Sequence, residues 1–314
     1  MSKPHIIIIA GPTAVGKTST SIELAKALNT EIISADSIQI YRGCDIGSAK
    51  VTDEEMQGIK HNLIDIKEPY ENYSVKEYRE DAFKIINNLN AENKIPIVCG
   101  GTGFYINSLI YDMNLDDNSQ DDDVRNKLYE ILEEKGIEYL RDALFHIDKK
   151  SFDRININDT KRNIRAIEYF ICTGNKFSDT FNTIRKINED ITFSYYALEM
   201  QRDLLYERIN KRVDIMLGDG LVDEVKQLMS NGITKENQSM QAIGYKEIIK
   251  YLEGEWDYDF AIEKLKQFSR NYAKRQLTWF RNDSNVKMID VNEFENVSQV
   301  VKFIEREEKI EGFL

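Results

Sequence analysis

The sequence predicts an α/β protein in which a parallel sheet flanked by helices is interrupted by an inserted helical domain and followed by a helical C-terminal part. In the first 113 residues, short β-branched apolar runs alternate with helix-compatible segments, a pattern typical of βαβ units. From about residue 115 to 190 the sequence contains no strong strand run. We therefore expect an α/β core made of residues 1–114 and 191–314, with residues 115–190 inserted as a helical domain.

The individual elements follow from runs and periodicity. The first part of the core is expected to contain strands at 6–9, 31–35 and 95–99 and helices at 19–28 and 74–89. The insert is expected to contain helices at 124–135, 137–144 and 160–172. Gly136 and Gly174 are expected to form turns, because glycine favours the backbone conformation that ends helices. After a strand at 192–198 we expect helices at 202–216, 221–230, 243–252 and 259–279, then a last strand at 286–289 and a polar tail.

The segment between the first strand and the first helix matches the pattern G-x-x-x-x-G-K-[ST] of a phosphate-binding loop (P-loop). Its glycines let the loop curl so that backbone N–H groups point at phosphate oxygens, and the helix N-terminus adds a partial positive charge. The core is therefore expected to be P-loop NTPase-like and to bind a phosphate or diphosphate. The loop consists of Gly11, Pro12, Thr13, Ala14, Val15, Gly16, Lys17 and Thr18. Lys17 is expected to reach the outermost phosphate, and Thr18 to offer its hydroxyl to Mg²⁺.

Two further polar residues follow predicted strands. Asp36 comes after the strand at 31–35, and Thr102 follows the glycines that end the strand at 95–99. Because carboxyl ends of parallel strands line the ligand crevice of an open α/β sheet, we expect both to face the P-loop. P-loop proteins that transfer a γ-phosphoryl group usually carry an acid at the end of a second strand. Gly100 stands at that position, so Asp36 is a candidate for a metal ligand or for a base that takes a proton.

Composition narrows the class of protein. The chain has 314 residues, 41% of them hydrophobic and 31% charged, which is typical of a soluble globular protein. No apolar run approaches the ~20 residues of a membrane span, and the first strand begins too early to leave room for a signal peptide. Cys44, Cys99 and Cys172 lack C-x-x-C spacing, which argues against a zinc site or a disulfide framework. We expect a cytoplasmic protein and, since no coiled-coil seam is present, a monomer.

Charge is distributed unevenly along the chain. The net charge of −12 argues against a nucleic-acid partner, yet residues 264–281 contain no acid. Lys266, Arg270 and Lys274 recur every four residues and share one helix face, as a stripe that follows a phosphate backbone would. A second basic patch lies at 161–165. The alternative interpretation is that both are ordinary solvated helix faces.

Aromatic residues interleave with the first basic stretch. Tyr272 and Trp279 also fit an apolar stripe with Leu265 and Phe268, so helical periodicity alone favours packing for these aromatics.

Several short motifs of the chain are similar to those of one protein family. GPTAVGKT, ISADSIQIY, DIGSAK, HNLIDI, CGGTGFYI, RNIRAIEYF, AIGYKE and AKRQLTWFR occur in this order from residue 6 to about 281. The chain thereby resembles the bacterial tRNA dimethylallyltransferases (tRNA isopentenyltransferases, the IPP transferase family). The resemblance implies a Mg²⁺-dependent prenyltransferase. Such an enzyme moves the dimethylallyl group from dimethylallyl diphosphate to N6 of the adenosine 3′ of the anticodon in tRNA, releasing diphosphate.

This chemistry is consistent with the residues. The P-loop then binds a leaving group, which explains why no acid is needed beside Gly100. An exocyclic amine is a weak nucleophile, so Asp36 is expected to take its proton, and Thr102 to hydrogen-bond the amine or a phosphate oxygen. Arg208 and Arg212, four residues apart on the helix at 202–216, are expected either to close over the diphosphate or to pair with nearby acids.

The resemblance also implies which residues contact tRNA, whose target adenine is expected to be flipped out of the anticodon loop. They are Asp36, Ser37, Ile38, Gln39, Thr102, Arg125, Lys161, Arg162, Asn163, Ile164, Arg165, Gln241, Ala242, Ile243, Gly244, Tyr245, Lys246, Lys274, Arg275, Gln276, Leu277, Thr278, Trp279, Phe280 and Arg281. The chain departs from the family pattern at Lys161 and Gln241, which puts those two contacts in doubt. The inserted domain is thereby expected to contact tRNA.

Three other functions remain open on the residues alone. An adenylate isopentenyltransferase would use the same donor with a free nucleotide as acceptor. A small-molecule P-loop kinase would transfer a phosphoryl group from ATP. An ATP-binding or other nucleotide-binding switch protein would consume no allylic donor. The basic helices favour tRNA over a free nucleotide, and the missing strand-end acid disfavours the kinase.

Overall fold

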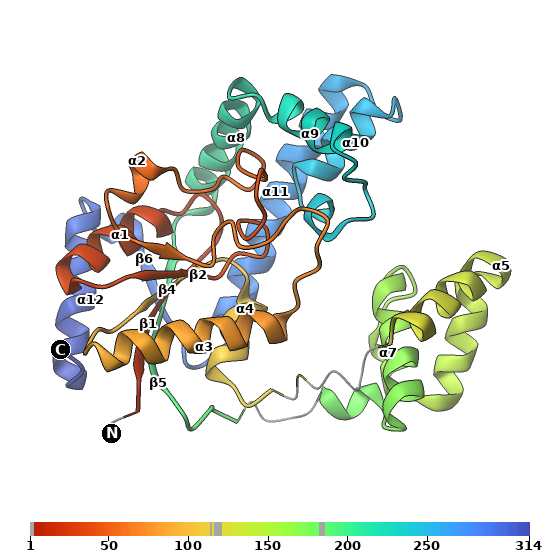
Figure 1. Ribbon diagram of the computed structural model, residues 1–314, viewed down its shortest axis with the longest axis horizontal. Helices are drawn as coiled ribbons and strands as arrows, with labels where there is room; N and C mark the ends of the chain where they lie inside the picture. Colours follow the sequence, from red (N-terminus) through yellow and green to blue (C-terminus); the bar gives the residue numbers. More distant parts are fainter. Residues whose placement is uncertain (1–2, 114, 116–120, 182–185) are drawn as a thin grey trace. The chain divides into compact units, whose positions relative to one another are not determined.

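The computed structural model describes residues 3–113, 115, 121–181 and 186–314. The chain forms two compact units, one comprising Met1–Ile110 with Asn188–Leu314 and the other Tyr111–Ile187. The larger unit is an α/β structure and the smaller one is helical (Figure 1).

A single parallel sheet organises the described part of the larger unit. Its strands are β1 (His5–Ala10), β2 (Ile32–Ser34), β3 (His61–Asn62), β4 (Ile97–Gly100), β5 (Thr192–Glu199) and β6 (Lys287–Asp290). They are ordered β3-β2-β4-β1-β5-β6, and every neighbouring pair is parallel. The predicted α/β class with a parallel sheet is therefore confirmed. Because the strands point the same way, the segments that follow β1, β2 and β4 lie at the same edge.

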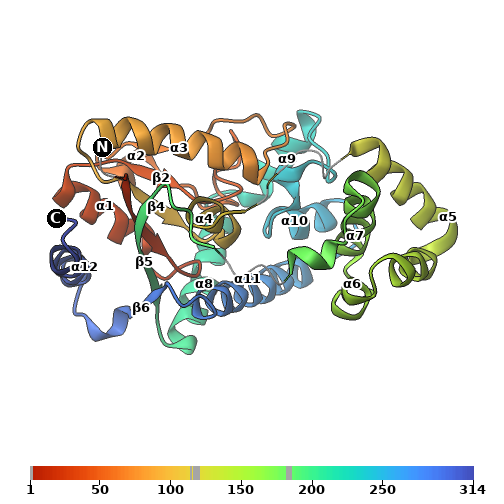
Figure 2. The same cartoon turned by 90° about the horizontal axis from the view of Figure 1, so that it is seen from below.

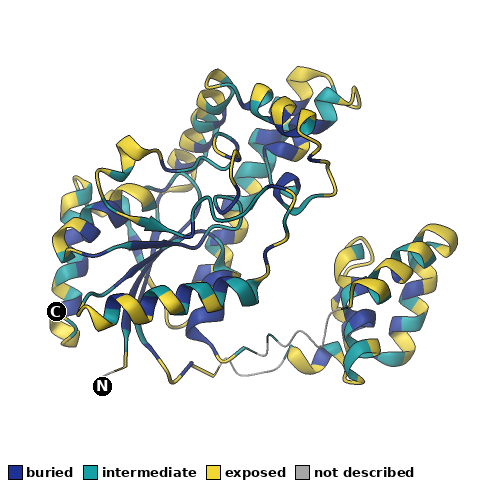
Figure 3. Ribbon diagram, in the orientation of Figure 1, coloured by how far each residue is buried: buried dark blue, intermediate teal, exposed yellow. Residues whose placement is uncertain are grey.

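Helices cover both faces of this sheet. The helices of the larger unit are α1 (Lys17–Leu28), α2 (Asp53–Met56), α3 (Val75–Ala91), α4 (Gly103–Ile110), α8 (Arg202–Gly218), α9 (Leu221–Ser230), α10 (Tyr245–Leu252), α11 (Tyr258–Arg281) and α12 (Val297–Glu311). Of these, α9 and α10 pack on other helices. In central strand β1, the side chains of residues 6–9 are fully buried (Figure 3). Such a strand needs cover on both faces, which explains its unbroken isoleucine run. Helix α1 packs against α12, α3 against α4, and α8 against α11 (Figure 2).

The C-terminal segment differs from the prediction. Where a polar tail was expected, α12 forms and buries Val300, Val301 and Ile304 in the same core cluster as residues of α1. Its apolar positions are spaced three and four residues apart, so they form one stripe among many charges. Asn296 caps the helix by accepting a hydrogen bond from the backbone N–H of Gln299. The prediction of a tail was therefore wrong, because the charged positions hide the helical period.

The smaller unit consists of helices α5 (Asp122–Ile147), α6 (Lys149–Arg154) and α7 (Thr160–Thr173), with a 3₁₀ turn at Phe177–Thr180. Gly136, at φ 80° and ψ 172°, breaks α5 where a turn was predicted, and Gly174, at φ 72°, ends α7. The core of this unit includes Leu128, Leu140 and Ile167. Across the described residues of both units, no helix is long and apolar enough to cross a bilayer.

Candidate active site

The P-loop connects β1 to α1 in a conformation that only some residues tolerate. Gly11 and Gly16 have φ of 144° and 109°, and Ala14 has φ of 66°. A Cβ on Gly11 would lie 2.6 Å from the carbonyl oxygen of Leu198 in β5, so a side chain there would collide with backbone. Val15 is buried and anchors the loop to the core. Residues in the left-handed region turn successive N–H groups toward one point, which is the geometry that anions bind.

Lys17 folds back over this loop. Its Nζ donates a hydrogen bond of 2.8 Å to the carbonyl oxygen of Pro12. Burial lowers the pKa of Lys17 to about 8; Cys99 acts in the opposite direction, the nearby Arg212 lowers the pKa further, and Asp36 raises it. The ammonium group is therefore costly to keep charged without an anion, which is the electrostatic state expected of a binding lysine.

The segments after β2 and β4 are tied to each other. Asp36 follows β2, and its Oδ1 accepts hydrogen bonds from the backbone N–H groups of Ile38 (2.9 Å) and Gln39 (3.3 Å). Thr102 follows β4, and its Oγ1 accepts a hydrogen bond of 3.2 Å from the backbone N–H of Ser37. Glycine is required at position 100, because a Cβ there would lie 2.2 Å from the carbonyl oxygen of Ala35. The two strand ends, which we predicted to converge, are thus in direct contact.

Two side chains of α11 complete this arrangement. The Oε1 atom of Gln276 accepts a hydrogen bond of 3.0 Å from the backbone N–H of Thr13, and its Nε2 donates one of 3.0 Å to the carbonyl oxygen of Gly101. Gln276 is buried, so it connects the P-loop to the segment after β4. Tyr272 lines the cavity, and burial together with the negative charge of Asp36 raises its pKa to about 12. Its hydroxyl therefore stays protonated at neutral pH.

Lys17, Asp36, Tyr272 and Gln276 line a cavity of about 530 Å³ within the larger unit, whereas Thr102, which we expected to face it, is not among the lining residues. One part of its wall is polar and charged, with Lys17, Thr18, Asp36 and Arg212. Another part is apolar and is formed by Ile209, Val213, Met216 and Leu265. The rim includes Ser37, Ile38, Gln39, Gln241, Ala242, Ile243, Gly244, Lys246 and Arg275. The cavity lining therefore combines cationic and apolar side chains.

The two arginines of α8 have different environments. Arg212 lines the cavity, and its Nη2 donates a hydrogen bond of 3.3 Å to the carbonyl oxygen of Ala49. Burial lowers its pKa below the usual value, while Asp36 and Glu55 act in the opposite direction. Arg208 is exposed and is not among the residues that line the cavity. Of the two candidates, Arg212 is the one placed at the cavity.

The basic residues of α11 do not form one open stripe. Lys266 pairs with Asp214 of α8 at 2.5 Å, and Arg270 donates a hydrogen bond of 2.6 Å to Asn210. The sequence pattern placed these residues on one face with Lys274 but could not show that α8 covers that face. The residues of the C-terminal half that remain exposed are Asn271, Lys274, Arg275, Thr278, Trp279 and Arg281. Phe280 is fully buried, Leu277 is half-buried, and Arg281 is paired with Glu199 at 2.6 Å.

The aromatic residues of α11 and the segment 242–246 also include both exposed and buried residues. Trp279 is 37% exposed, whereas Tyr272 faces the cavity, so an apolar packing stripe describes neither of them adequately. Tyr245 is fully buried, and its hydroxyl donates a hydrogen bond of 2.7 Å to Glu224.

In the smaller unit, Lys161 and Arg162 are exposed, whereas Asn163 and Ile164 are buried. Arg125 and Arg165 both pair with the fully buried carboxylate of Glu168, at 2.8 and 3.0 Å. One acid on α7 therefore holds two of the predicted tRNA-contacting arginines in place.

The apolar wall was not predicted from the sequence. A signal for it exists, because Ile209, Val213 and Met216 recur at helical spacing around Arg212. The bridging role of Gln276 had no such signal, since its partners lie in loops far away in the sequence.

Comparison with known proteins supplies the family. Residues 39–283 match the family model described as IPP transferase. The chain is 49% identical over 300 residues to the tRNA dimethylallyltransferase of Clostridioides difficile (strain 630), with 96% of each chain covered.

Solved structures agree with this match. The tRNA isopentenylpyrophosphate transferase of Bacillus halodurans is 43% identical with a TM-score of 0.72, covering 98% of this chain and 99% of that one. A eukaryotic dimethylallyltransferase acting on tRNA is 30% identical with a TM-score of 0.80, covering 99% of this chain and 80% of that one. The chain therefore belongs to the IPP transferase family of tRNA dimethylallyltransferases.

Proposed function

We propose that this protein transfers a dimethylallyl group from dimethylallyl diphosphate to N6 of the adenosine 3′ of the anticodon in tRNA, releasing diphosphate. The observation that carries the proposal is the lining of this cavity, which combines cationic side chains with aliphatic ones. A diphosphate needs cationic partners and a five-carbon allyl group needs apolar ones.

The donor is bound by the P-loop and activated as a leaving group. The backbone N–H groups of Gly11–Thr18, the Lys17 ammonium and the Arg212 guanidinium stabilise the charge that develops on the diphosphate as the allylic C–O bond breaks. Lys17 exchanges its hydrogen bond with the Pro12 carbonyl for one with a phosphate oxygen. Ile209, Val213, Met216 and Leu265 enclose the allyl group and exclude water from it.

The acceptor approaches from the side of Asp36. As N6 forms its bond to the allylic carbon, its proton passes to the Asp36 carboxylate, whose Oδ1 is already oriented by two backbone N–H groups. Thr102, whose Oγ1 is bonded to the backbone N–H of Ser37, orients the amine by a hydrogen bond. The electron pair of the broken C–O bond leaves with the diphosphate, so the reaction is balanced.

Mg²⁺ fits this site through Thr18. The described residues contain no group of three or more His, Cys, Asp or Glu side chains that could hold a metal. Mg²⁺ does not require one, because it commonly binds through one or two protein oxygens, water and substrate phosphates. Thr18 lines the cavity next to Lys17, and its hydroxyl is a suitable ligand. When bound, the metal would neutralise part of the charge on the departing diphosphate.

Contacts with tRNA are assigned to exposed and half-buried residues in both units. In the larger unit these are the rim of the cavity and the exposed residues of α11, chiefly Lys274, Arg275 and Trp279. In the smaller unit they are Lys161, Arg162 and the pair Arg125 and Arg165. The buried members of the predicted set, Asn163, Ile164, Tyr245, Gln276 and Phe280, act by positioning their neighbours. Since tRNA is the acceptor, we assign the reaction to the cytoplasm.

The test is transfer of label from dimethylallyl diphosphate, with Mg²⁺, to unmodified tRNA and in parallel to AMP. We expect label in tRNA alone, lost when the adenosine 3′ of the anticodon is replaced. Label in AMP would instead indicate an adenylate isopentenyltransferase. Label in neither, with phosphoryl transfer from ATP, would indicate a kinase.

The role of Asp36 has its own test. Asp36→Asn keeps an oxygen for the N–H groups of Ile38 and Gln39 but removes the base, so we expect kcat to fall about 10²–10⁴-fold with tRNA affinity unchanged. Weakened tRNA binding with normal turnover at saturating tRNA would contradict this role.

A further inference from the structure

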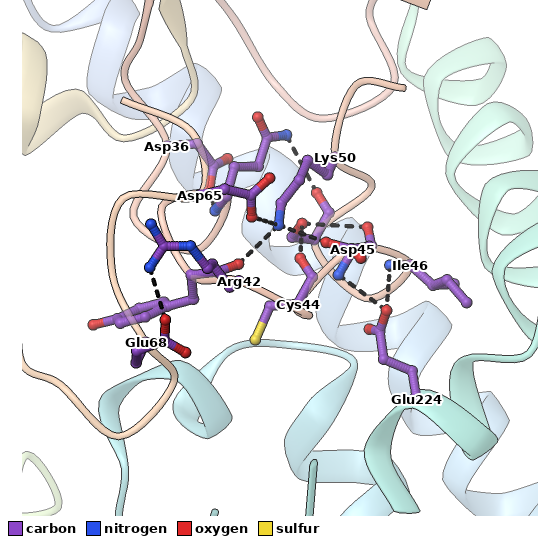
Figure 4. Close-up of polar contacts among 12 residues, drawn as sticks. Asp36, Arg42, Cys44, Asp45, Ile46, Lys50, Asp65, Glu68 and Glu224 are labelled. Carbon is purple, nitrogen blue, oxygen red and sulfur yellow. Dashed lines mark hydrogen bonds and ion pairs between the residues drawn. The ribbon is translucent and has the colours of Figure 1, made fainter. Parts of the chain in front are cut away.

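Glu224 of α9 lies against the backbone turn formed by residues 45–47 (Figure 4). Its Oε2 accepts hydrogen bonds from the backbone N–H groups of Asp45 (2.9 Å) and Ile46 (2.7 Å). Its Oε1 accepts one from the N–H of Gly47 (2.9 Å) and one from the hydroxyl of Tyr245 (2.7 Å). Three successive N–H groups thus converge on one carboxylate, as they do in anion-binding nests. Charge-assisted bonds of this kind are stronger than neutral ones.

The same turn is fixed on its other sides. Lys50, whose side chain is 6% exposed, reaches Asp45 and Asp65 at 2.5 Å each and the carbonyl oxygen of Tyr41 at 2.7 Å (Figure 4). Gly47 lies directly against Tyr245, since a Cβ there would come within 2.5 Å of the tyrosine ring. The turn therefore has little freedom to move while Glu224 and Tyr245 are in place.

The end of this turn is part of the cavity wall. Gly47, Ser48 and Ala49 line the cavity, and Glu224 is not among the lining residues. The carbonyl oxygen of Ala49 accepts hydrogen bonds from Arg212 and from the side chain of Gln39, each at 3.3 Å. Since both bonds are already long, a small displacement of Ala49 would break them. The position of the turn thereby decides where the Arg212 guanidinium lies.

We infer that Glu224 is a positioning residue for the diphosphate of the donor: it fixes the turn at 45–47 so that the Ala49 carbonyl holds Arg212 in the cavity. This inference rests on the proposed function, because it assigns Arg212 to the diphosphate. The hydroxyl of Tyr245 donates a hydrogen bond to Glu224, and Tyr245 belongs to the segment 241–246, which contributes to the cavity rim. The turn at 45–47 is thereby linked to that segment.

The test is a double-mutant cycle on the full chain, read out as the Kd of inorganic diphosphate with Mg²⁺ by calorimetry. In Glu224→Gln, one acceptor oxygen becomes an NH₂ group that cannot accept from a backbone N–H. We expect the Kd to rise about tenfold, which corresponds to about 1.4 kcal/mol. In an Arg212→Met background the same substitution should change the Kd less than twofold, because its effect passes through Arg212. Asp223→Asn, an exposed neighbour on α9, is the matched control and should leave the Kd unchanged.

Independent effects of Glu224→Gln and Arg212→Met would overturn the inference. If Glu224→Gln fails to fold, judged by thermal unfolding, Tyr245→Phe removes one of the four hydrogen bonds more gently. It should raise the Kd two- to threefold only when Arg212 is present, and an equal effect without Arg212 would again refute the inference. Failure of the proposed function is distinguishable, because the wild-type protein would then transfer no label to tRNA, whatever its affinity for diphosphate.

Discussion

We predict that Lys17 lowers the free energy of unfolding of the protein when no anion is bound. The substitution Lys17→Met should therefore raise that free energy. The lysine is held near Arg212 in a buried site that lowers its pKa from 10.5 to about 8. Methionine has a similar length and no charge, so it removes the electrostatic penalty while keeping most of the packing. A site prepared for a diphosphate should be more stable without its lysine when no anion is bound.

The magnitude follows from the shift in pKa. The difference between 10.5 and about 8 corresponds to about 3 kcal/mol. Because the folded-state pKa is the lower one, the penalty is fully present below pH 8. Between pH 8 and 10.5 the folded protein carries neutral Lys17 while the unfolded chain still binds the proton. The penalty therefore decreases over this range and is lost above pH 10.5. The lost hydrogen bond to Pro12 offsets about 1 kcal/mol. Lys17→Met should therefore be more stable than the wild type by about 2 kcal/mol at pH 7, and about equal to it or slightly less stable at pH 10.

Urea unfolding of both proteins at half-unit intervals from pH 7 to 10, followed by tryptophan fluorescence, measures this difference. Other groups titrate in the same way in both proteins and cancel. A difference in the free energy of unfolding that stays constant over the whole range would show that Lys17 is not desolvated, and the electrostatic account of the site would be wrong.

Two further predictions use matched pairs of variants. Gly100→Ala should lower the free energy of unfolding by about 3 kcal/mol in urea unfolding, because its Cβ would lie 2.2 Å from the backbone of Ala35. Gly218→Ala, with nothing within 4 Å, should be neutral or slightly stabilising; equal effects of the two would refute the steric argument. Lys274→Ala should weaken tRNA binding and reduce the slope of log affinity against log salt by about one, whereas Lys266→Ala, already paired with Asp214, should change the slope less. The two slopes are measured by filter binding, and a larger change for Lys266 would reverse the assignment of the two faces of α11.

Local signals were enough to predict the centre of the site. The P-loop is contiguous, and its strand and helix flank it in the sequence. Asp36 and Thr102 are distant from it along the chain, yet a general property of parallel sheets predicted that they converge, and the bond between Ser37 and Thr102 confirms that their segments meet.

The rest of the site depends on packing between distant segments, which the sequence pattern does not specify. The contact of Gln276 with Thr13 spans more than 260 residues, and a buried glutamine on a basic helix has no periodicity of its own. Similarly, the charges of Lys266 and Arg270 indicated a basic face but not that α8 would supply Asp214 and Asn210 to cover it. The periodicity of one helix does not show which residues of another helix will pair with it.

Helix α11 consequently has two functional faces that substitutions should separate. Gln276 is buried and connects the P-loop to Gly101, and Tyr272 lines the cavity, so changes there should act on donor binding and turnover. Lys274 and Trp279 are exposed, so changes there should act on tRNA affinity. Because inward and outward residues alternate within two turns, an RNA that binds the outer face contacts the same helix that shapes the donor cavity.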